Sequence, residues 1–271
     1  MPSWGFKGKN YMKRLIVGLL ALTVAALSGQ AAKADRFEDI IKKGTVRIAV
    51  PLDVPPFGSQ NEKREPEGFD VELAGMVAKA LGVKLELQQV TGANRIPFLL
   101  TDKVDIVISV MGLTPERAKQ IMFTSPYADT KLAVFGPKSA NVASADKIGS
   151  LKVAAAKGTT QELALSAMAP RATIMRTEDD ATAAAAYLSG QAELFATNTL
   201  IIPDLQKRNP AKEFELKFTI RRSPAHMGVR MGEHNLARWL DSFIFFNMMN
   251  GELDRLHQKY LGIPLAPLPS L

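Results

Sequence analysis

The sequence of 271 residues contains no cysteine. A chain without cysteine has no disulfide bonds, no thiolate nucleophile and no zinc site built on thiolates. It also lacks the residue that carries the lipid anchor of a bacterial lipoprotein. We therefore expect a fold held together by its apolar core, which 46% hydrophobic residues and ordinary charge content can supply.

Histidine is scarce, and the usual signatures of bound cofactors are missing. His226, His234 and His257 are scattered without the spacing of metal ligands, and no glycine-rich fingerprint for a dinucleotide or a phosphate occurs. The sequence offers no pairing of a nucleophile with a base. We accordingly predict no metal, no cofactor and no catalytic residue, although His226 lies near a predicted connection between two lobes.

Long apolar runs are also absent, apart from one near the N-terminus. Four basic residues (Lys7, Lys9, Lys13 and Arg14) precede an apolar run of 13 residues over 15–27, and Ala32-Lys33-Ala34 follows as a small-x-small cleavage site. This order is typical of a secretory signal peptide, and the run is short for a membrane span. We predict a signal peptide over 1–34 and a periplasmic protein that is soluble and not lipid-anchored.

The net charge of +7 is largely a property of that leader. Residues 1–34 hold five of the 34 basic residues and no acidic one, which leaves 29 basic and 27 acidic residues in the rest of the chain. A balance of +2 gives no reason to expect a nucleic acid partner.

Beyond the leader, short apolar strands alternate with amphipathic helices. This alternation predicts an α/β fold with mostly parallel sheets. The strands are expected over 45–50, 83–90, 104–110, 132–135, 151–156, 193–197 and 228–230, and the main helices over 36–43, 69–81, 181–188 and 235–260.

Residues 111–117 are the most informative segment. They follow a buried strand, and Thr114 and Pro115 are favourable as the N-cap and first residue of a helix. Arg117 then falls in the first helical turn, where the helix dipole is already positive. An anion held by the guanidinium explains this placement. A surface arginine paired with Glu116 or another carboxylate is the alternative, and spacing alone does not separate the two.

A second segment repeats this arrangement in the other half of the chain. A strand over 151–156 leads into a turn and a helix, with Thr159 and Glu162 at the spacing of a capping box. Two helix starts suited to an anion, one in each half, suggest that a carboxylate is held between two lobes.

Together these motifs resemble the family of periplasmic amino acid-binding proteins of ABC importers. The resemblance rests on an ordered set of motifs: Val54-Pro55-Pro56-Phe57-Gly58, Gly68-Phe69-Asp70-Val71-Glu72-Leu73, Thr114-Pro115-Glu116-Arg117-Ala118, Phe123-Thr124-Ser125-Pro126-Tyr127, Gly158-Thr159-Thr160-Gln161-Glu162 and Asn250-Gly251-Glu252-Leu253-Asp254.

The resemblance implies a two-lobed periplasmic-binding-protein fold with two hinge crossings. Lobe 1 would comprise 35–127 and 227–271, lobe 2 would comprise 132–221, and the hinge would lie at 128–131 and 222–226. It also implies a monomer that captures an amino acid or related carboxylate between its lobes and delivers it to permease subunits in the inner membrane.

The resemblance further implies that Arg117 binds the α-carboxylate of the ligand, aided by Thr160 and the neighbouring Thr159. The ammonium side departs from the family pattern, which usually has a hydroxyl residue at Gly112 and an aspartate at Asn198. The Asn198 amide oxygen and the Val110 carbonyl remain as acceptors, although Asn198 can instead be a turn residue at the end of its strand.

The missing negative charge has two explanations. Either another carboxylate, such as Asp53, supplies it, or the ligand has no free α-amine.

The loops that would surround the ligand side chain supply the remaining candidates. Gly92, Asn94 and Arg95 follow the second strand, and in the resembled family this loop touches the ligand side chain. Asp53 and Phe57 lie in the loop after the first strand; Asp53 can instead cap the turn, and Phe57 can instead pack beneath it.

Two other classes of function stay open. An enzyme on this scaffold, a dehydratase or lyase, could act on a carboxylated substrate, and a sensory module could use the same pocket. The sequence does not name the ligand.

Overall fold

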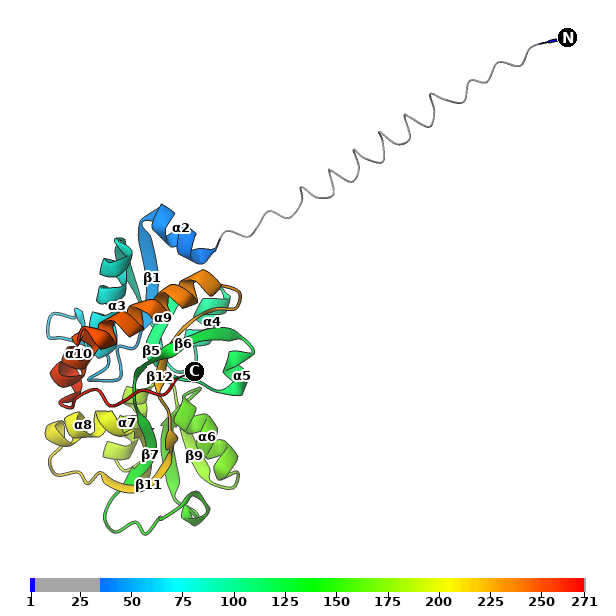
Figure 1. Cartoon of the computed structure of the whole chain (residues 1–271). Coiled ribbons are helices and arrows are strands. Elements are labelled where there is room, and N and C mark those ends of the chain that lie inside the picture. Colours follow the sequence, from blue (N-terminus) through cyan, green and yellow to red (C-terminus); the bar gives the residue numbers. More distant parts are fainter. Residues whose placement is uncertain (3–34, 271) are drawn as a thin grey trace. The chain divides into compact units, whose positions relative to one another are not determined.

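The computed structural model describes residues 1–2 and 35–270, and residues 35–271 form one compact unit (Figure 1). The predicted signal peptide therefore lies almost wholly outside the described residues. Among the residues described, no helix is both long enough and apolar enough to cross a membrane.

The first sheet has the strand order β4–β1–β5–β12–β6. Its strands are β1 (Thr45–Val50), β4 (Lys84–Gln89), β5 (Ile106–Gly112), β6 (Ile121–Ala128) and β12 (Ala225–Arg230), and a small hairpin follows β1, formed by β2 (Ser59–Gln60) and β3 (Pro66–Glu67). The helices of this half are α2 (Arg36–Lys43), α3 (Phe69–Leu81), α4 (Arg95–Leu100), α5 (Pro115–Ala118), α9 (His234–Met249) and α10 (Glu252–Leu261).

The second sheet has the order β11–β7–β10–β8–β9. Its strands are β7 (Lys131–Gly136), β8 (Lys152–Ala156), β9 (Thr173–Thr177), β10 (Leu194–Asn198) and β11 (Glu215–Arg222). The helices of this half are α6 (Thr160–Met168), α7 (Asp180–Leu188) and α8 (Ile202–Arg208), with short 3-10 turns η1 (Ala145–Lys147) and η2 (Thr199–Ile201).

Each sheet combines parallel and antiparallel pairs. Parallel pairing joins β4, β1 and β5 in one sheet and β10, β8 and β9 in the other, as the alternation of strands and helices predicted. The strand that follows each crossing, β7 in one sheet and β12 in the other, instead pairs antiparallel with both its neighbours. The predicted α/β architecture is confirmed, with parallel pairing confined to part of each sheet.

Helix ends agree with the sequence signals where glycine follows a periodic apolar run. Gly44 ends α2 and Gly82 ends α3, both in the left-handed conformation. The single helix predicted over 235–260 is wrong. Gly251 has a φ of 83° and separates α9 from α10, because a left-handed residue cannot continue an α-helix.

The chain crosses between the sheets twice, from β6 to β7 and from β11 back to β12. The two crossings are hydrogen-bonded to each other: the Thr130 hydroxyl donates to the Ser223 carbonyl, and the Ser223 N–H donates to the Thr130 carbonyl at 2.8 Å. Both residues are buried. The connection therefore consists of two adjacent segments of chain that are hydrogen-bonded to each other.

Candidate functional site

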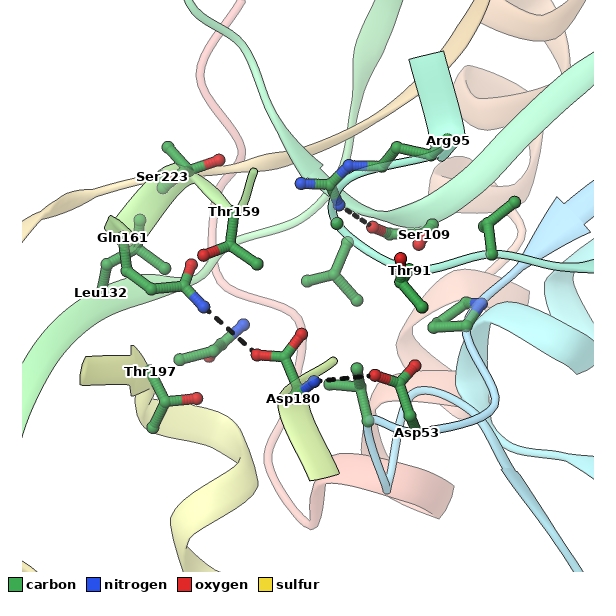
Figure 2. Close-up of a pocket in the computed structure, with 17 residues that line it drawn as sticks. Asp53, Thr91, Arg95, Ser109, Leu132, Thr159, Gln161, Asp180, Thr197 and Ser223 are labelled. Atoms are coloured by element: carbon green, nitrogen blue, oxygen red, sulfur yellow. Dashed lines mark hydrogen bonds between the residues drawn. The ribbon is translucent and has the colours of Figure 1, made fainter. Parts of the chain in front are cut away.

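A pocket lies where the carboxyl ends of β1, β5, β8 and β10 and the loops after them meet (Figure 2). This is the edge at which open α/β sheets bind ligands. The pocket is lined by Pro51, Asp53, Val54, Val90, Thr91, Gly92, Arg95, Ser109, Val110, Leu132, Thr159, Thr160, Gln161, Asp180, Thr197, Asn198 and Ser223. Seven of the eleven sequence-predicted site residues are among them: Asp53, Gly92, Arg95, Val110, Thr159, Thr160 and Asn198.

Arg117 lies beside this pocket and joins the two halves of the chain. Its Nη1 donates to the Gly112 carbonyl at 2.6 Å and to Thr160 Oγ1 at 2.8 Å, and its Nη2 donates to the Gly158 carbonyl at 2.9 Å. The side chain lines an adjoining opening that shares Gly92 and Thr160 with the pocket. The structure therefore brings Arg117 and Thr160 together across the cleft.

The guanidinium of Arg117 is buried without a counter-charge. Only 5% of the residue is exposed, and within the described residues it forms no ion pair with a carboxylate. Burial, together with repulsion from Arg95 and Arg221, lowers the pKa of Arg117 to about 9. A buried cation is costly unless it is paired, so this arrangement favours an anionic ligand.

The helix that carries Arg117 is a single turn. Thr114 does cap α5, since its side chain accepts from the Arg117 N–H at 3.2 Å, but α5 spans only Pro115–Ala118. One turn has too few aligned peptides for a substantial dipole. The affinity of this place for an anion thus depends on the guanidinium itself.

The second motif forms half of the predicted capping box, because Thr159 caps α6 but Glu162 bonds the residue before Thr159. Thr159 Oγ1 accepts from the Glu162 N–H and donates to the Ala156 carbonyl at 2.7 Å, and the Glu162 carboxylate accepts from the Gly158 N–H. The Thr159 hydroxyl is thus used within its own turn. Thr160 begins α6, and its hydroxyl accepts from Arg117.

A second guanidinium reaches the pocket from α4. Arg95 is 5% exposed, and its Nη1 donates to the Ser109 carbonyl at 2.7 Å (Figure 2). Its Nε is buried and has no partner within the described part of the chain. Burial lowers the pKa of Arg95, whereas the carboxylates of Asp180 and Asp53 raise it.

Residues 46–263 match the family described as bacterial extracellular solute-binding proteins, family 3. The chain belongs to this family. The "ABC transporter glutamine-binding protein GlnH" of Bacillus subtilis is 27% identical to it over 270 residues, covering 93% of this chain and 97% of that protein.

The cyclohexadienyl dehydratase of Pseudomonas aeruginosa is another relative, 27% identical over 75% of this chain and 80% of its own length. Among solved structures, the ancestral amino acid-binding protein AncCDT-1, described as a precursor of cyclohexadienyl dehydratase, has a TM-score of 0.77 and 30% identity. That match covers 83% of this chain and 99% of AncCDT-1.

Gly112 of this solute-binding protein has no room for a side chain. A Cβ placed on it would lie 2.3 Å from Ser223 Oγ and 2.9 Å from Thr160 Oγ1. Two hydroxyls from other segments therefore occupy the space beside Gly112. Ser223, which sequence reasoning did not identify, lines the pocket from the crossing itself.

Asn198 offers the pocket a donor where an acceptor was predicted. Its Oδ1 accepts from the Leu200 N–H at 2.9 Å, so the turn after β10 uses the amide oxygen. The Nδ2 group is buried without a partner in the described structure. Because the Leu200 N–H requires an acceptor, the NH₂ group is the end left for a ligand.

Besides Arg117 and Gly112, two further predicted site residues, Phe57 and Asn94, do not line the pocket. Phe57 is fully buried and packs edge-on against Phe69, 5.9 Å between ring centroids, because the loop after β1 folds back over α3. Asn94 turns its Oδ1 to the Thr91 N–H at 2.9 Å and stabilises the loop before α4. Both side chains have structural contacts instead.

His226 also lies outside the pocket lining. It is buried in β12, its Nδ1 is 2.7 Å from the Thr124 carbonyl oxygen, and its ring packs against Phe123. These contacts give the histidine a structural role. In the described residues no group of three or more His, Asp or Glu side chains could hold a metal ion.

Sequence reasoning missed Asp180, which is the first residue of α7 and only 9% exposed. Its N–H donates to Asp53 Oδ2 at 2.9 Å, and its Oδ1 lies 3.3 Å from the Gln161 amide nitrogen. The sequence feature that could have identified Asp180 is the acidic run Glu178-Asp179-Asp180 directly after a parallel strand. The helix that follows is rich in alanine, which is typical of a packed surface.

Val110 owes its position in the pocket to a buried acid. Its φ of 43° is strained for a β-branched residue. The Val110 N–H is fixed by Asp70 Oδ2 at 3.0 Å and by the Tyr127 hydroxyl at 2.9 Å. Asp70 is fully buried at the start of α3, and burial raises its pKa to about 7.

We expect the substitution Asp70→Asn to change how folding stability depends on pH. A carboxyl whose pKa is raised on folding stabilises the folded state at low pH, and this contribution is lost as the pH rises towards 7. The variant should therefore gain a few kcal/mol relative to the wild type between pH 4 and pH 7. Thermal unfolding at a series of pH values measures this difference, and a difference that stays constant with pH would contradict it.

Proposed function

We propose that this solute-binding protein captures an amino acid in the pocket between its two sheets. The observation that carries the proposal is Arg117, a buried guanidinium that contacts both halves of the chain and has no carboxylate partner among the described residues. A ligand carboxylate would complete its charge balance, with Thr160 contributing from the opposite side.

The mechanism follows from contacts that need both halves of the chain. We take residues 35–127 and 227–271 as lobe 1, residues 132–221 as lobe 2, and residues 128–131 and 222–226 as the hinge. A ligand that touches both lobes has higher affinity for the closed form and shifts the equilibrium towards it. Permease subunits would then recognise the closed, loaded protein.

The predicted leader and the name of the family agree on the place of action. Family 3 comprises extracellular solute-binding proteins. With residues 1–34 as a cleaved signal peptide, the chain would act as a periplasmic monomer. Cell fractionation and size-exclusion chromatography of the exported protein test both points.

A thermal-shift panel tests the ligand class. The full chain is stripped of bound molecules by unfolding and refolding and is mixed with each of the twenty amino acids, and separately with organic acids that lack an amine. We expect one or a few amino acids to raise the unfolding temperature by several degrees. Stabilisation by none of them at millimolar concentration would overturn the proposal.

The dehydratase relative makes an enzymatic role the second candidate. The pocket holds acidic groups that could transfer protons, Asp53 and Asp180. Mass spectrometry of a bound amino acid after prolonged incubation distinguishes the two roles. We expect the ligand to be recovered unchanged, and its conversion to a lighter product would favour the enzyme.

A further inference from the structure

Two carboxylates approach the pocket from opposite lobes. Asp53 lies in the loop after β1, and Asp180 is the first residue of α7 in the other half. The two residues are joined by one hydrogen bond, in which the Asp180 backbone N–H donates to Asp53 Oδ2 at 2.9 Å. Figure 2 shows the Asp180 carboxylate between Gln161 and Asp53, facing the interior of the pocket.

Neither carboxylate is neutralised by the described protein. Asp53 Oδ1 is buried without a hydrogen-bond partner, and the Asp180 side chain has one contact, 3.3 Å to Gln161. Arg95 interacts electrostatically with both acids. However, its Nη1 donates to the Ser109 carbonyl, and among residues 35–270 it forms no ion pair with either acid. Two acids left in this state destabilise the closed form unless a cation joins them.

Asn198 cannot accept a hydrogen bond from a cationic group of the ligand. Its amide oxygen is bound to the Leu200 N–H, and its NH₂ group, a donor, is buried without a partner in the described structure of this lining residue. A donor at this place repels an ammonium group. The acceptors for a cation must therefore come from the Asp53 and Asp180 side of the pocket.

We propose that Asp180, assisted by Asp53, binds a cationic group of the carboxylated ligand, namely a protonated amine or a guanidinium. This inference rests on the proposed function and adds the residues that recognise the positive end of the ligand. The two acids come from different lobes, so a cation between them favours closure. Arg117 and Asp180 then select a molecule that carries both charges.

Isothermal titration calorimetry on Asp180→Asn tests the inference. The full chain is titrated with the tightest-binding amino acid of the panel and with the 2-hydroxy acid that has the same side chain. We expect the variant to lose roughly 10- to 100-fold in affinity for the amino acid, as for a charge-assisted hydrogen bond. Its affinity for the 2-hydroxy acid should change less than about threefold.

Glu178→Gln is the matched control, because it removes one negative charge from an exposed residue two positions away. It should bind like the wild type. Asp53→Asn is the second test variant and should show the same pattern as Asp180→Asn, more weakly. Thermal unfolding confirms that each variant is folded before titration.

Titration with amino acids that have neutral side chains shows which cationic group of the ligand Asp180 binds. A loss in Asp180→Asn for these compounds assigns the pair to the α-ammonium, and a loss confined to arginine and lysine assigns it to a side-chain cation. Unchanged amino acid affinity in Asp180→Asn overturns this inference alone. Failure of the wild type to bind any amino acid overturns the proposed function and this inference with it.

Proton release gives a second readout. Burial, and then the charge of Asp53, raises the pKa of Asp180 to about 7, and Arg95 and Asp179 also face it. A bound cation lowers that pKa, so binding at pH 7 should release protons in the wild type and fewer in Asp180→Asn. Titration in two buffers of different ionisation enthalpy measures the difference, and equal release would contradict the proposed pairing.

Discussion

Replacing Arg117 with methionine should lower the affinity for the amino acid ligand by at least about a hundredfold. The side chain would lose two or more charge-assisted hydrogen bonds, each contributing about 1.5–3 kcal/mol. Methionine retains much of the buried volume, so the fold should survive. Calorimetric titration with the ligand identified by the panel measures the loss.

Arg221→Met is the matched control for this experiment. Arg221 is exposed, borders the opening beside Arg117 and lowers the pKa of Arg117 by repulsion. Its removal deletes a cation from the same region without changing the contacts between the lobes that Arg117 makes. We expect affinity within about threefold of the wild type. If Arg117→Met also binds normally, Arg117 is only a contact between the lobes and the proposed carboxylate site is wrong.

Gly92→Ala should have the second-largest effect, because it obstructs closure. A Cβ at Gly92 would lie 2.7 Å from Thr159 Cγ2 and 2.8 Å from the Lys157 carbonyl oxygen, on the opposite lobe. Backbone on the far side must move away, so the closed form is destabilised while each lobe keeps its own packing. We expect affinity to fall at least about tenfold with the unfolding temperature of the ligand-free protein unchanged.

The control for Gly92→Ala is the same substitution at Gly75. A Cβ there has no neighbour within 4 Å, and Gly75 lies inside α3, where alanine is favoured by roughly 0.5–1 kcal/mol. Gly75→Ala should bind normally and unfold at a slightly higher temperature. Small-angle scattering with and without ligand shows whether Gly92→Ala still closes, and full closure with normal affinity would refute the steric argument.

Local sequence signals predicted the scaffold and part of the candidate site. The strand that precedes Arg117 and the capping residues around Thr159 depend on residues close in the chain, and these features have the predicted form. The contact between Arg117 and Thr160 could also be anticipated, since each follows a strand of its own sheet and the carboxyl ends of these strands meet at the pocket. Such features are governed by capping and periodicity, which a sequence displays directly.

The remaining features depend on the approach of segments far apart in the chain. Nothing near Gly112 shows that Ser223 would fill the space beside it. Asp180 becomes part of the pocket through its contact with Asp53, which lies 127 residues earlier in the chain. These are consequences of tertiary packing, which local patterns do not encode.

The double crossing between the sheets should restrict the motion available to the lobes. Because Thr130 and Ser223 bond each other across the two crossings, we expect the connection to bend more easily than it twists or stretches. Ser223 also borders the pocket, so a ligand bound there would lie directly against this connection. We therefore expect ligand occupancy and the angle of opening to be coupled at one place, with no relay through the body of either lobe.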